Sequence, residues 1–321
     1  MTPFGTTIDG KDVHKITLSA GDLTISLLTY GAILQNVRLT GIDRSLTLGS
    51  DRLADYEGPM CYHGSLIGPV VNRISNARMR IDGMVYELER NEKGHIHLHS
   101  GPYGTQRQIW DVLAATSTSA TLALDLRDGV CGLPGNRQIT AIFTVSPPAT
   151  LTMQITGTTD EKTAMNFANH SYWNLDGSDT WHGHSLQIDA DQYLPSTADA
   201  YPTGEIADVA GTDMNFRHAR RISPGEPNID NNFCLSDTDQ PLRDILHLQG
   251  QSGVSVTVGT TAPGIQIYDG RQAKRPGRAL YEGLAIEAQG WPDAPNNPHF
   301  PSIMIEPEET YQQTTRWIFA K

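Results

Sequence analysis

Cysteine is scarce in this sequence. Only Cys61, Cys131 and Cys234 occur among 321 residues, and no two of them have the CxxC spacing. An odd and sparse set argues against a disulfide framework and against a thiolate zinc site. We therefore expect inert thiols in a reducing compartment.

Positive charge and long apolar runs are also lacking. Lysine and arginine total 24 against 36 acidic residues, which gives a formal net charge of −12. This balance argues against a nucleic-acid partner and against anionic membrane surfaces, since both require a cationic footprint. No apolar run reaches about 18 residues, and the N-terminus lacks the basic and apolar regions of a signal peptide. We expect a soluble cytoplasmic protein whose ligand is a neutral or cationic small molecule, with no membrane or nucleic-acid partner.

The dominant hydrophobic period is two, which is typical of half-buried strands. Alternating runs cover 22–29 and 32–39, and two short runs flank Asp82-Gly83, a hairpin signal because this dipeptide tolerates a positive φ. Further strands are expected over 121–126, 139–145 and 150–156, and a short helix over 50–56. The sequence thus predicts an all-β fold, a large antiparallel β-sandwich that forms a single domain over residues 1–321.

Three histidines, His95, His97 and His99, follow each other at every second position. On a strand they would share one face and could bind a transition metal. The alternative is one or two hydrogen-bonding histidines with the rest exposed.

Two further segments contain groups suited to sugar chemistry. Residues 166–175, Asn-Phe-Ala-Asn-His-Ser-Tyr-Trp-Asn-Leu, combine amides, an imidazole and aromatic rings, which bind sugar hydroxyls and the apolar face of a pyranose. Residues 305–311, Ile-Glu-Pro-Glu-Glu-Thr-Tyr, contain carboxylates that could accept a proton if the fold directs one into a pocket. A polar loop and a solvated acidic turn are the structural alternatives.

Taken in order, the motifs of this chain resemble those of the aldose 1-epimerase (galactose mutarotase) family from end to end. The motifs that carry the resemblance are Phe4-Gly, Leu28-Thr-Tyr-Gly-Ala, Gly68-Pro-Val-Val-Asn-Arg-Ile, Leu98-His-Ser-Gly, Asn169-His-Ser-Tyr-Trp-Asn-Leu, Pro202-Thr-Gly-Glu-Ile, Ile229-Asp-Asn-Asn-Phe, Pro263-Gly-Ile-Gln-Ile-Tyr, Glu287-Ala-Gln-Gly-Trp-Pro-Asp and Pro307-Glu-Glu-Thr-Tyr.

The resemblance implies a β-sandwich of the supersandwich type and interconversion of the α and β anomers of a free aldose, without a cofactor or a metal. It implies that Glu309 is the general base and His170 the general acid. It also implies that five residues hold the sugar hydroxyls: Asn72, Arg73, His99, Asp230 and Gln266. Only His99 of the histidine triplet matches a family position, which weakens the metal interpretation. Monomer and homodimer remain open.

The chain departs from the family pattern at Pro69, Ser100, Trp173 and Glu308. Glu308 is adjacent to Glu309 and would raise its pKa if both carboxylates faced the cleft. Two other functions remain as alternatives: a sugar-binding protein without catalysis, and a metal-dependent enzyme that uses the histidine triplet. A function on phosphorylated sugars has little support, because Arg73 is the only arginine placed in the cleft.

Overall fold

The structure is a computed structural model that describes all residues, 1–321, and it consists almost entirely of strands. Its only α-helix, α1, is Leu53–Glu57. It begins three residues after the start of the expected segment 50–56 and ends one residue beyond it. Short 3₁₀ turns cover Ser75–Ala77, Gly101–Tyr103, Thr105–Arg107, Val130–Gly132 and Ala294–Asn296. The expected all-β fold is confirmed.

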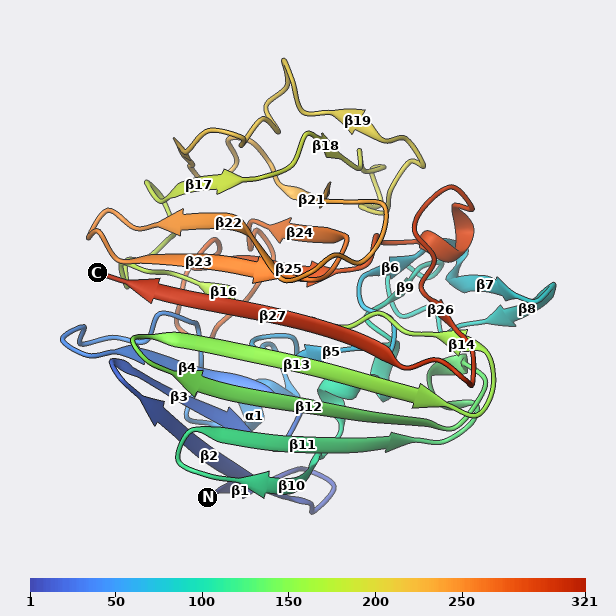
Figure 1. Cartoon of the computed structure of the whole chain (residues 1–321), viewed down its shortest axis with the longest axis horizontal. Helices are drawn as coiled ribbons and strands as arrows, with labels where there is room; N and C mark the ends of the chain where they lie inside the picture. Colours follow the sequence, from blue (N-terminus) through green and yellow to red (C-terminus); the bar gives the residue numbers. More distant parts are fainter.

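The largest sheet has nine antiparallel strands in the order β10-β11-β12-β13-β27-β23-β22-β17-β20 (Figure 1). Their bounds are Asp111–Ala115, Ser119–Leu126, Arg137–Ser146, Thr150–Thr159, Tyr311–Ala320, Ser255–Thr260, Arg243–Gln249, Ser185–Ile188 and Arg220–Arg221. Alternate residues of β12 are buried, because only one face of this sheet packs on the core. The C-terminal strand β27 lies between β13 and β23 and so joins the two halves of the sheet.

A four-stranded N-terminal sheet, β1-β2-β3-β4, packs against the β11–β12 half of the large sheet (Figure 1). Its strands are Thr2–Thr6, Asp12–Ala20, Leu23–Leu28 and Ile33–Leu39. The alternating runs in 22–29 and 32–39 form β3 and β4, and the Asp82-Gly83 turn joins β7, Arg78–Ile81, to β8, Met84–Glu87.

A six-stranded sheet, β16-β25-β24-β21-β18-β19, lies behind the upper half of the large sheet (Figure 1). Its strands are Tyr172–Trp173, Leu284–Gln289, Gly264–Tyr268, Asp230–Cys234, Gln192–Tyr193 and Ala207–Asp208. All six residues of β25 are buried, so a polar side chain on this strand is held out of bulk water.

Short two-stranded pairs complete the fold and bring distant segments together. They are β5 (Leu66–Ile67) with β15 (Ala168–Asn169), β6 (Arg73–Ile74) with β9 (His97–Leu98), and β14 (Thr163–Ala164) with β26 (Met304–Ile305).

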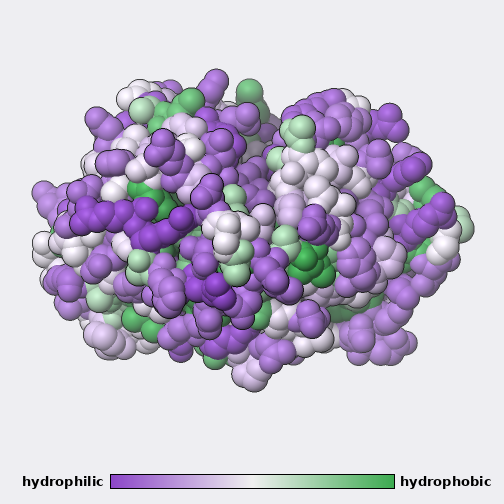
Figure 2. Space-filling view, turned by 90° about the horizontal axis from the view of Figure 1, so that it is seen from above, coloured by the Kyte–Doolittle hydropathy of each residue, from purple (hydrophilic) through white to green (hydrophobic).

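Fifty buried residues form one continuous core cluster that contains side chains from all three large sheets. The surface in Figure 2 is mostly hydrophilic, and hydrophobic residues show only as small separate patches. No helix in this fold has the length and apolar character needed to cross a bilayer. All three cysteines are free thiols; Cys131 and Cys234 are buried, and Cys61 is partly exposed.

Candidate active site

Short strands and loops around the six-stranded sheet enclose a cleft of about 760 Å³. We call it the first chamber. Its lining residues are Pro59, Cys61, Tyr62, His63, Asn72, Arg73, Glu92, Leu98, His99, His170, Tyr172, Asp230, Tyr268, Gln272, Ala273 and Glu287. Five of the seven residues predicted for the site lie in this list.

His170 and Glu287 form the most deeply buried polar pair of the chamber. The Nε2 atom of His170 lies 3.5 Å from the Oε1 atom of Glu287. His170 directly follows β15, and Glu287 lies in the middle of the fully buried strand β25. The second carboxylate oxygen of Glu287 and the Nδ1 atom of His170 have no hydrogen-bond partner within the protein. Both side chains therefore retain polar atoms that are not used for structure.

His99 is held in one tautomer by the neighbouring strand. The backbone N–H of Asn72 donates to Nδ1 of His99 at 3.1 Å, so the ring hydrogen of the neutral imidazole is on Nε2. Both residues have a positive φ, 68° at Asn72 and 52° at His99, which places them in tight bends where β6 and β9 meet. The backbone at Asn72 thus fixes the imidazole of His99 so that its Nε2–H is the donor available to the chamber.

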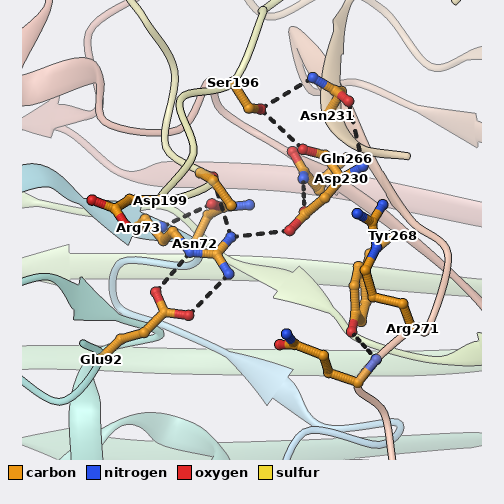
Figure 3. A network of polar contacts seen from close by, with 12 residues as sticks. Asn72, Arg73, Glu92, Ser196, Asp199, Asp230, Asn231, Gln266, Tyr268 and Arg271 are labelled. Carbon is orange, nitrogen blue, oxygen red and sulfur yellow. Dashed lines mark hydrogen bonds and ion pairs between the residues drawn. The ribbon is translucent and has the colours of Figure 1, made fainter. Parts of the chain in front are cut away.

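Arg73 connects two carboxylates at one end of the first chamber (Figure 3). Its guanidinium contacts Glu92 at 2.7 and 3.0 Å and Asp230 at 3.3 Å. Gln266 donates to the other oxygen of Asp230 at 2.7 Å. Gln266 does not line the chamber itself, and its hydrogen bond orients the carboxylate of Asp230, which does.

Burial controls the ionisation of the central groups. It raises the pKa of Glu287 well above its usual value, and the negative charge of Asp230 raises this pKa further. Burial lowers the pKa of His170 to about 4 and also lowers that of His99. Burial raises the pKa of Asp230, although Arg73 opposes this effect. Burial thus disfavours the charged forms of these four side chains, whereas the two carboxylates beside Arg73 raise the pKa of its guanidinium and keep it charged.

Aromatic rings line the chamber on the side of the histidines. The ring of Tyr62 lies 4.7 Å from that of His99 and 5.9 Å from that of His170, between ring centres. Tyr172 lies 5.0 Å from His170 and 4.3 Å from His63, on which it stacks. Such faces pack against the apolar side of a sugar ring.

Glu309, the predicted general base, does not line this chamber. It lies in an exposed turn before β27, where its carboxylate accepts a hydrogen bond from the backbone N–H of Glu306 at 3.0 Å. The nearest cavity to Glu309 is a different one, which it shares with Tyr311 and Asn166. The prediction that Glu309 lies opposite His170 is wrong. The segment of Glu309 forms the solvated acidic turn that was the alternative interpretation. Glu287 is the carboxylate that lies beside His170.

The sequence around Glu287 also carries a signal for a buried functional acid. Glu287 begins one of the motifs that carry the family resemblance, and it interrupts the apolar strand Leu284–Gln289. A carboxylate flanked by apolar residues on a strand is a candidate for a buried functional acid, because such groups are almost never buried without a role or a partner.

The histidine triplet does not form a common ligand set. His95 is exposed and contacts Asp199 at 3.0 Å, whereas His97 is buried and contacts the carbonyl of Glu89 at 2.7 Å. Only His99 lines the chamber. The strand β9 is only two residues long, so the triplet does not keep a single face.

Three of the residues that depart from the family pattern lie in a loop, in the core and on the surface. The Ser100 hydroxyl accepts from the backbone N–H of Val70 at 2.9 Å and donates to its carbonyl at 3.1 Å, which fixes the loop beside His99. Trp173 is fully buried in the core. Glu308 is exposed and, like Glu309, lies outside the chamber, so it does not act on the central pair.

These features define a β-sandwich protein with a buried imidazole–carboxylate pair in a polar and aromatic cleft. The family model described as "Aldose 1-epimerase" matches residues 14–317. A protein named galactose mutarotase from Bos taurus is 30% identical over 96% of this chain and 94% of its own, and one named aldose 1-epimerase from Escherichia coli is 30% identical over 97% and 96%. A solved aldose epimerase homologue from C. elegans superposes with a TM-score of 0.88 at 27% identity, covering 96% of this chain and 99% of its own. A solved galactose 1-epimerase from Lactobacillus acidophilus gives 0.85 at 26% identity, covering 98% and 97%.

The chain belongs to the aldose 1-epimerase family. It is an isomerase of the racemase and epimerase type that acts on carbohydrates.

Proposed function

We propose that this protein interconverts the α and β anomers of a free aldose such as galactose or glucose, with Glu287 and His170 as the acid–base pair. The observation that carries the proposal is their contact at 3.5 Å in a cleft that is also lined by sugar-binding groups. The names of the relatives support galactose among the substrates.

Each half of the reaction needs one proton acceptor and one proton donor. Glu287 removes the proton from the C1 hydroxyl while protonated His170 donates a proton to the ring oxygen. The C1–O5 bond breaks, and the C1 hydroxyl becomes the carbonyl of the open-chain aldehyde. Rotation about C1–C2 presents the other face of the carbonyl, and the two groups exchange roles on closure. The pair carries one proton throughout, so the enzyme returns to its starting state.

The direction of the pKa shifts supports this assignment. A raised pKa makes the carboxylate of Glu287 a stronger base, and a lowered pKa makes protonated His170 a stronger acid. Shifts in these directions leave the single proton of the pair on Glu287 at neutral pH, and its transfer to His170 across their contact gives the reactive form with ionised Glu287 and protonated His170. Each well-placed proton transfer contributes roughly 10²–10⁴-fold to the rate.

The remaining chamber groups hold the sugar. The Nε2–H of His99 donates, Asp230 accepts, and Arg73 fixes Asp230 while keeping one N–H of its guanidinium free for the sugar. Asn72 positions His99, and Gln266 positions Asp230. Mutarotation transfers protons and leaves oxidation states unchanged overall, so the proposal includes neither a metal nor another cofactor.

We also propose that the protein works in the cytoplasm, as a monomer or a homodimer. Its three free thiols fit a reducing compartment.

Polarimetry of freshly dissolved α-D-galactose and α-D-glucose tests the function. We expect the approach to the anomeric equilibrium to be much faster with the protein than in buffer alone, and the rate to be proportional to the protein concentration. A rate equal to that of the buffer with both hexoses, and also with aldopentoses, would contradict the proposal.

A further inference from the structure

A second chamber of about 780 Å³ shares no lining residue with the first. Leu48 is its only hydrophobic lining residue. We call it the arginine pocket, because its charged lining residues are Arg38, Arg44, Arg275, Arg278, Asp51 and Glu282. Four arginines against two carboxylates give a local excess of two positive charges, in a chain whose formal net charge is −12. Such a concentration of guanidinium groups in one cavity favours an anionic ligand.

Three of the four arginines keep free N–H groups. Arg38 is exposed, and its side chain makes no hydrogen bond or ion pair within the protein. Arg278 contacts Glu282 only through Nε, at 3.7 Å, so both of its terminal nitrogens are free. Arg44 uses Nε and Nη2 on the backbone carbonyl of Leu175 and keeps Nη1 free. The planar guanidinium group matches the geometry of phosphate oxygens, so these three side chains suit a phosphate group.

The two carboxylates of the arginine pocket do not neutralise these three arginines. Glu282 binds Arg275 with both of its carboxylate oxygens. The third nitrogen of Arg275 donates to the backbone carbonyl of Gly49 at 3.2 Å, so this arginine is engaged within the protein. Asp51 accepts from the side-chain amide of Gln35 at 3.1 Å and forms no ion pair.

The neutral lining residues indicate what kind of molecule would carry the phosphate. No aromatic side chain lines the arginine pocket, so it offers no ring on which a nucleobase could stack. The side-chain oxygen of Asn36 is buried without a hydrogen-bond partner, and Asp51 has further acceptor capacity. Both groups can accept hydrogen bonds from hydroxyl groups. A phosphate ester of a polyhydroxy compound, such as a sugar phosphate, therefore fits better than a nucleotide.

A thin apolar wall separates the arginine pocket from the first chamber. Leu48 lines the pocket and belongs to one small hydrophobic cluster with Tyr172, Tyr268 and Ala273, which line the first chamber. The backbone N–H of Leu48 also donates to the carbonyl of Tyr172 at 2.9 Å. A ligand in the pocket would thus lie close to the bound sugar without entering its site.

One loop, residues 269–283 between β24 and β25, contributes to both cavities. Gln272 and Ala273 line the first chamber, whereas Arg275 and Arg278 line the arginine pocket. A contact that holds one end of this loop therefore acts on residues that border the sugar.

The outer part of this loop, residues 274–280, has few ties to the rest of the protein. A single hydrogen bond, from Arg275 to Gly49, leads from it to a residue outside the loop. A phosphate bound between Arg278 on the loop and Arg38 on β4 would add a second tie. A loop that is ordered before the sugar arrives costs less conformational entropy when the sugar binds.

We propose that the arginine pocket is an effector site that binds the phosphate group of a small polyhydroxy molecule, and that its occupation strengthens sugar binding in the first chamber. Phosphate binding is independent of the proposed function, whereas the effect on sugar binding rests on it. The free aldose carries no charge and the effector does, so the two ligands are distinguished by the arginines.

Isothermal titration calorimetry with glucose 1-phosphate tests the binding. This ester has no free C1 hydroxyl, so it cannot be anomerised. We expect it to bind with one-to-one stoichiometry while the first chamber is saturated with galactose, and to bind more tightly than without galactose, because coupling between two sites is reciprocal. Absence of binding, or competition with galactose, would overturn the proposal. Inorganic phosphate in a parallel titration identifies the source: weaker binding than the ester supports a sugar phosphate, and equal binding supports free phosphate at the same site.

Substitution of exposed arginines locates the site. Arg38→Gln and Arg278→Gln should each weaken the binding of glucose 1-phosphate by roughly tenfold, because each removes hydrogen bonds to a charged group. Arg221→Gln is the matched control, since Arg221 is exposed on β20 and lies outside the pocket. Both pocket arginines are exposed, so their loss should not disturb folding. Equal affinities in both pocket variants and wild type would overturn the assignment.

Polarimetry of α-D-galactose measures the effect on catalysis. Saturating glucose 1-phosphate should lower KM about fivefold, after subtraction of the protein-free reaction at the same phosphate concentration. The effect should disappear in Arg38→Gln and persist in Arg221→Gln. An unchanged or raised KM would overturn the effector role. If the protein binds glucose 1-phosphate but anomerises no sugar, the proposed function is wrong and the phosphate site stands.

Discussion

The imidazole of His170 and the carboxylate of Glu287 face each other at 3.5 Å, although 117 positions separate them in the sequence. The contact arises because β15, which precedes His170, lies beside β25, which contains Glu287. Both side chains are almost completely buried, at 3% and 1% exposure. Burial of two titratable groups is costly unless they are paired, so their juxtaposition indicates function more than stability.

The first prediction distinguishes the two candidate bases. Glu287→Gln should lower kcat for mutarotation by roughly 10²–10⁴-fold, because an amide cannot accept the C1 hydroxyl proton. Glu309→Gln is the matched control, and it should keep the wild-type rate because Glu309 lies in an exposed turn outside the chamber. Polarimetry of α-D-galactose measures both. Loss of activity in Glu309→Gln with a normal rate in Glu287→Gln would reverse the assignment.

Much of the fold follows from local sequence patterns. The two-residue period identified β3, β4, β11, β12 and β13, and Asp82-Gly83 identified a hairpin, because both signals depend only on neighbouring residues. The pairing of β27 between β13 and β23 could not be read in this way, because β27 lies more than a hundred residues from β13 and more than fifty from β23 in the sequence.

The candidate site likewise divides into residues that the sequence motifs indicated and a choice of catalytic carboxylate that they left open. Ordered motifs indicated His170, His99, Asn72, Arg73 and Asp230, which the fold does bring to one cleft. They did not separate Glu287 from Glu309, since both lie in matching motifs and the difference between them is burial. Burial depends on which strand lies in the interior, and only the three-dimensional structure gives that.

The second prediction separates the two chamber histidines. His170→Gln should lower kcat by roughly 10²–10⁴-fold, because it removes the group that protonates the ring oxygen. His99→Gln should act mainly on KM, raising it about tenfold, because His99 is a neutral Nε2–H donor fixed by Asn72. Initial rates over a range of galactose concentrations distinguish the two effects. Equal losses of kcat in both variants would contradict this division of roles.

The third prediction concerns the basic limb of the pH profile. The pair must carry one proton to react, and the raised pKa of Glu287 makes this residue the one that loses it, so kcat/KM should fall as the pH rises through that pKa. The charge of Asp230 contributes to that shift, so Asp230→Asn should move the limb to lower pH while also weakening sugar binding. Glu308→Gln removes an exposed carboxylate outside the chamber and should leave the limb unchanged. An Asp230→Asn profile that coincides with that of wild type after scaling would refute the coupling.

The last prediction concerns the stability that is lost to keep a carboxylate in the core. The pKa of Glu287 is higher in the folded than in the unfolded protein, because burial disfavours its charge. Its contribution to the free energy of unfolding is therefore fully present below the unfolded pKa, and it is lost as the pH rises through the folded pKa. Glu287→Gln removes that dependence, since a neutral amide of similar shape fills the same space. We expect the Tm of Glu287→Gln to exceed that of wild type most at pH 8, and the difference to shrink as the pH falls toward 5.

Calorimetry at pH 5, 6, 7 and 8 measures this, with Glu309→Gln as the exposed control that should follow wild type. A difference that grows toward low pH would mean that Glu287 is stabilised as the charged form, contrary to the direction inferred from its burial.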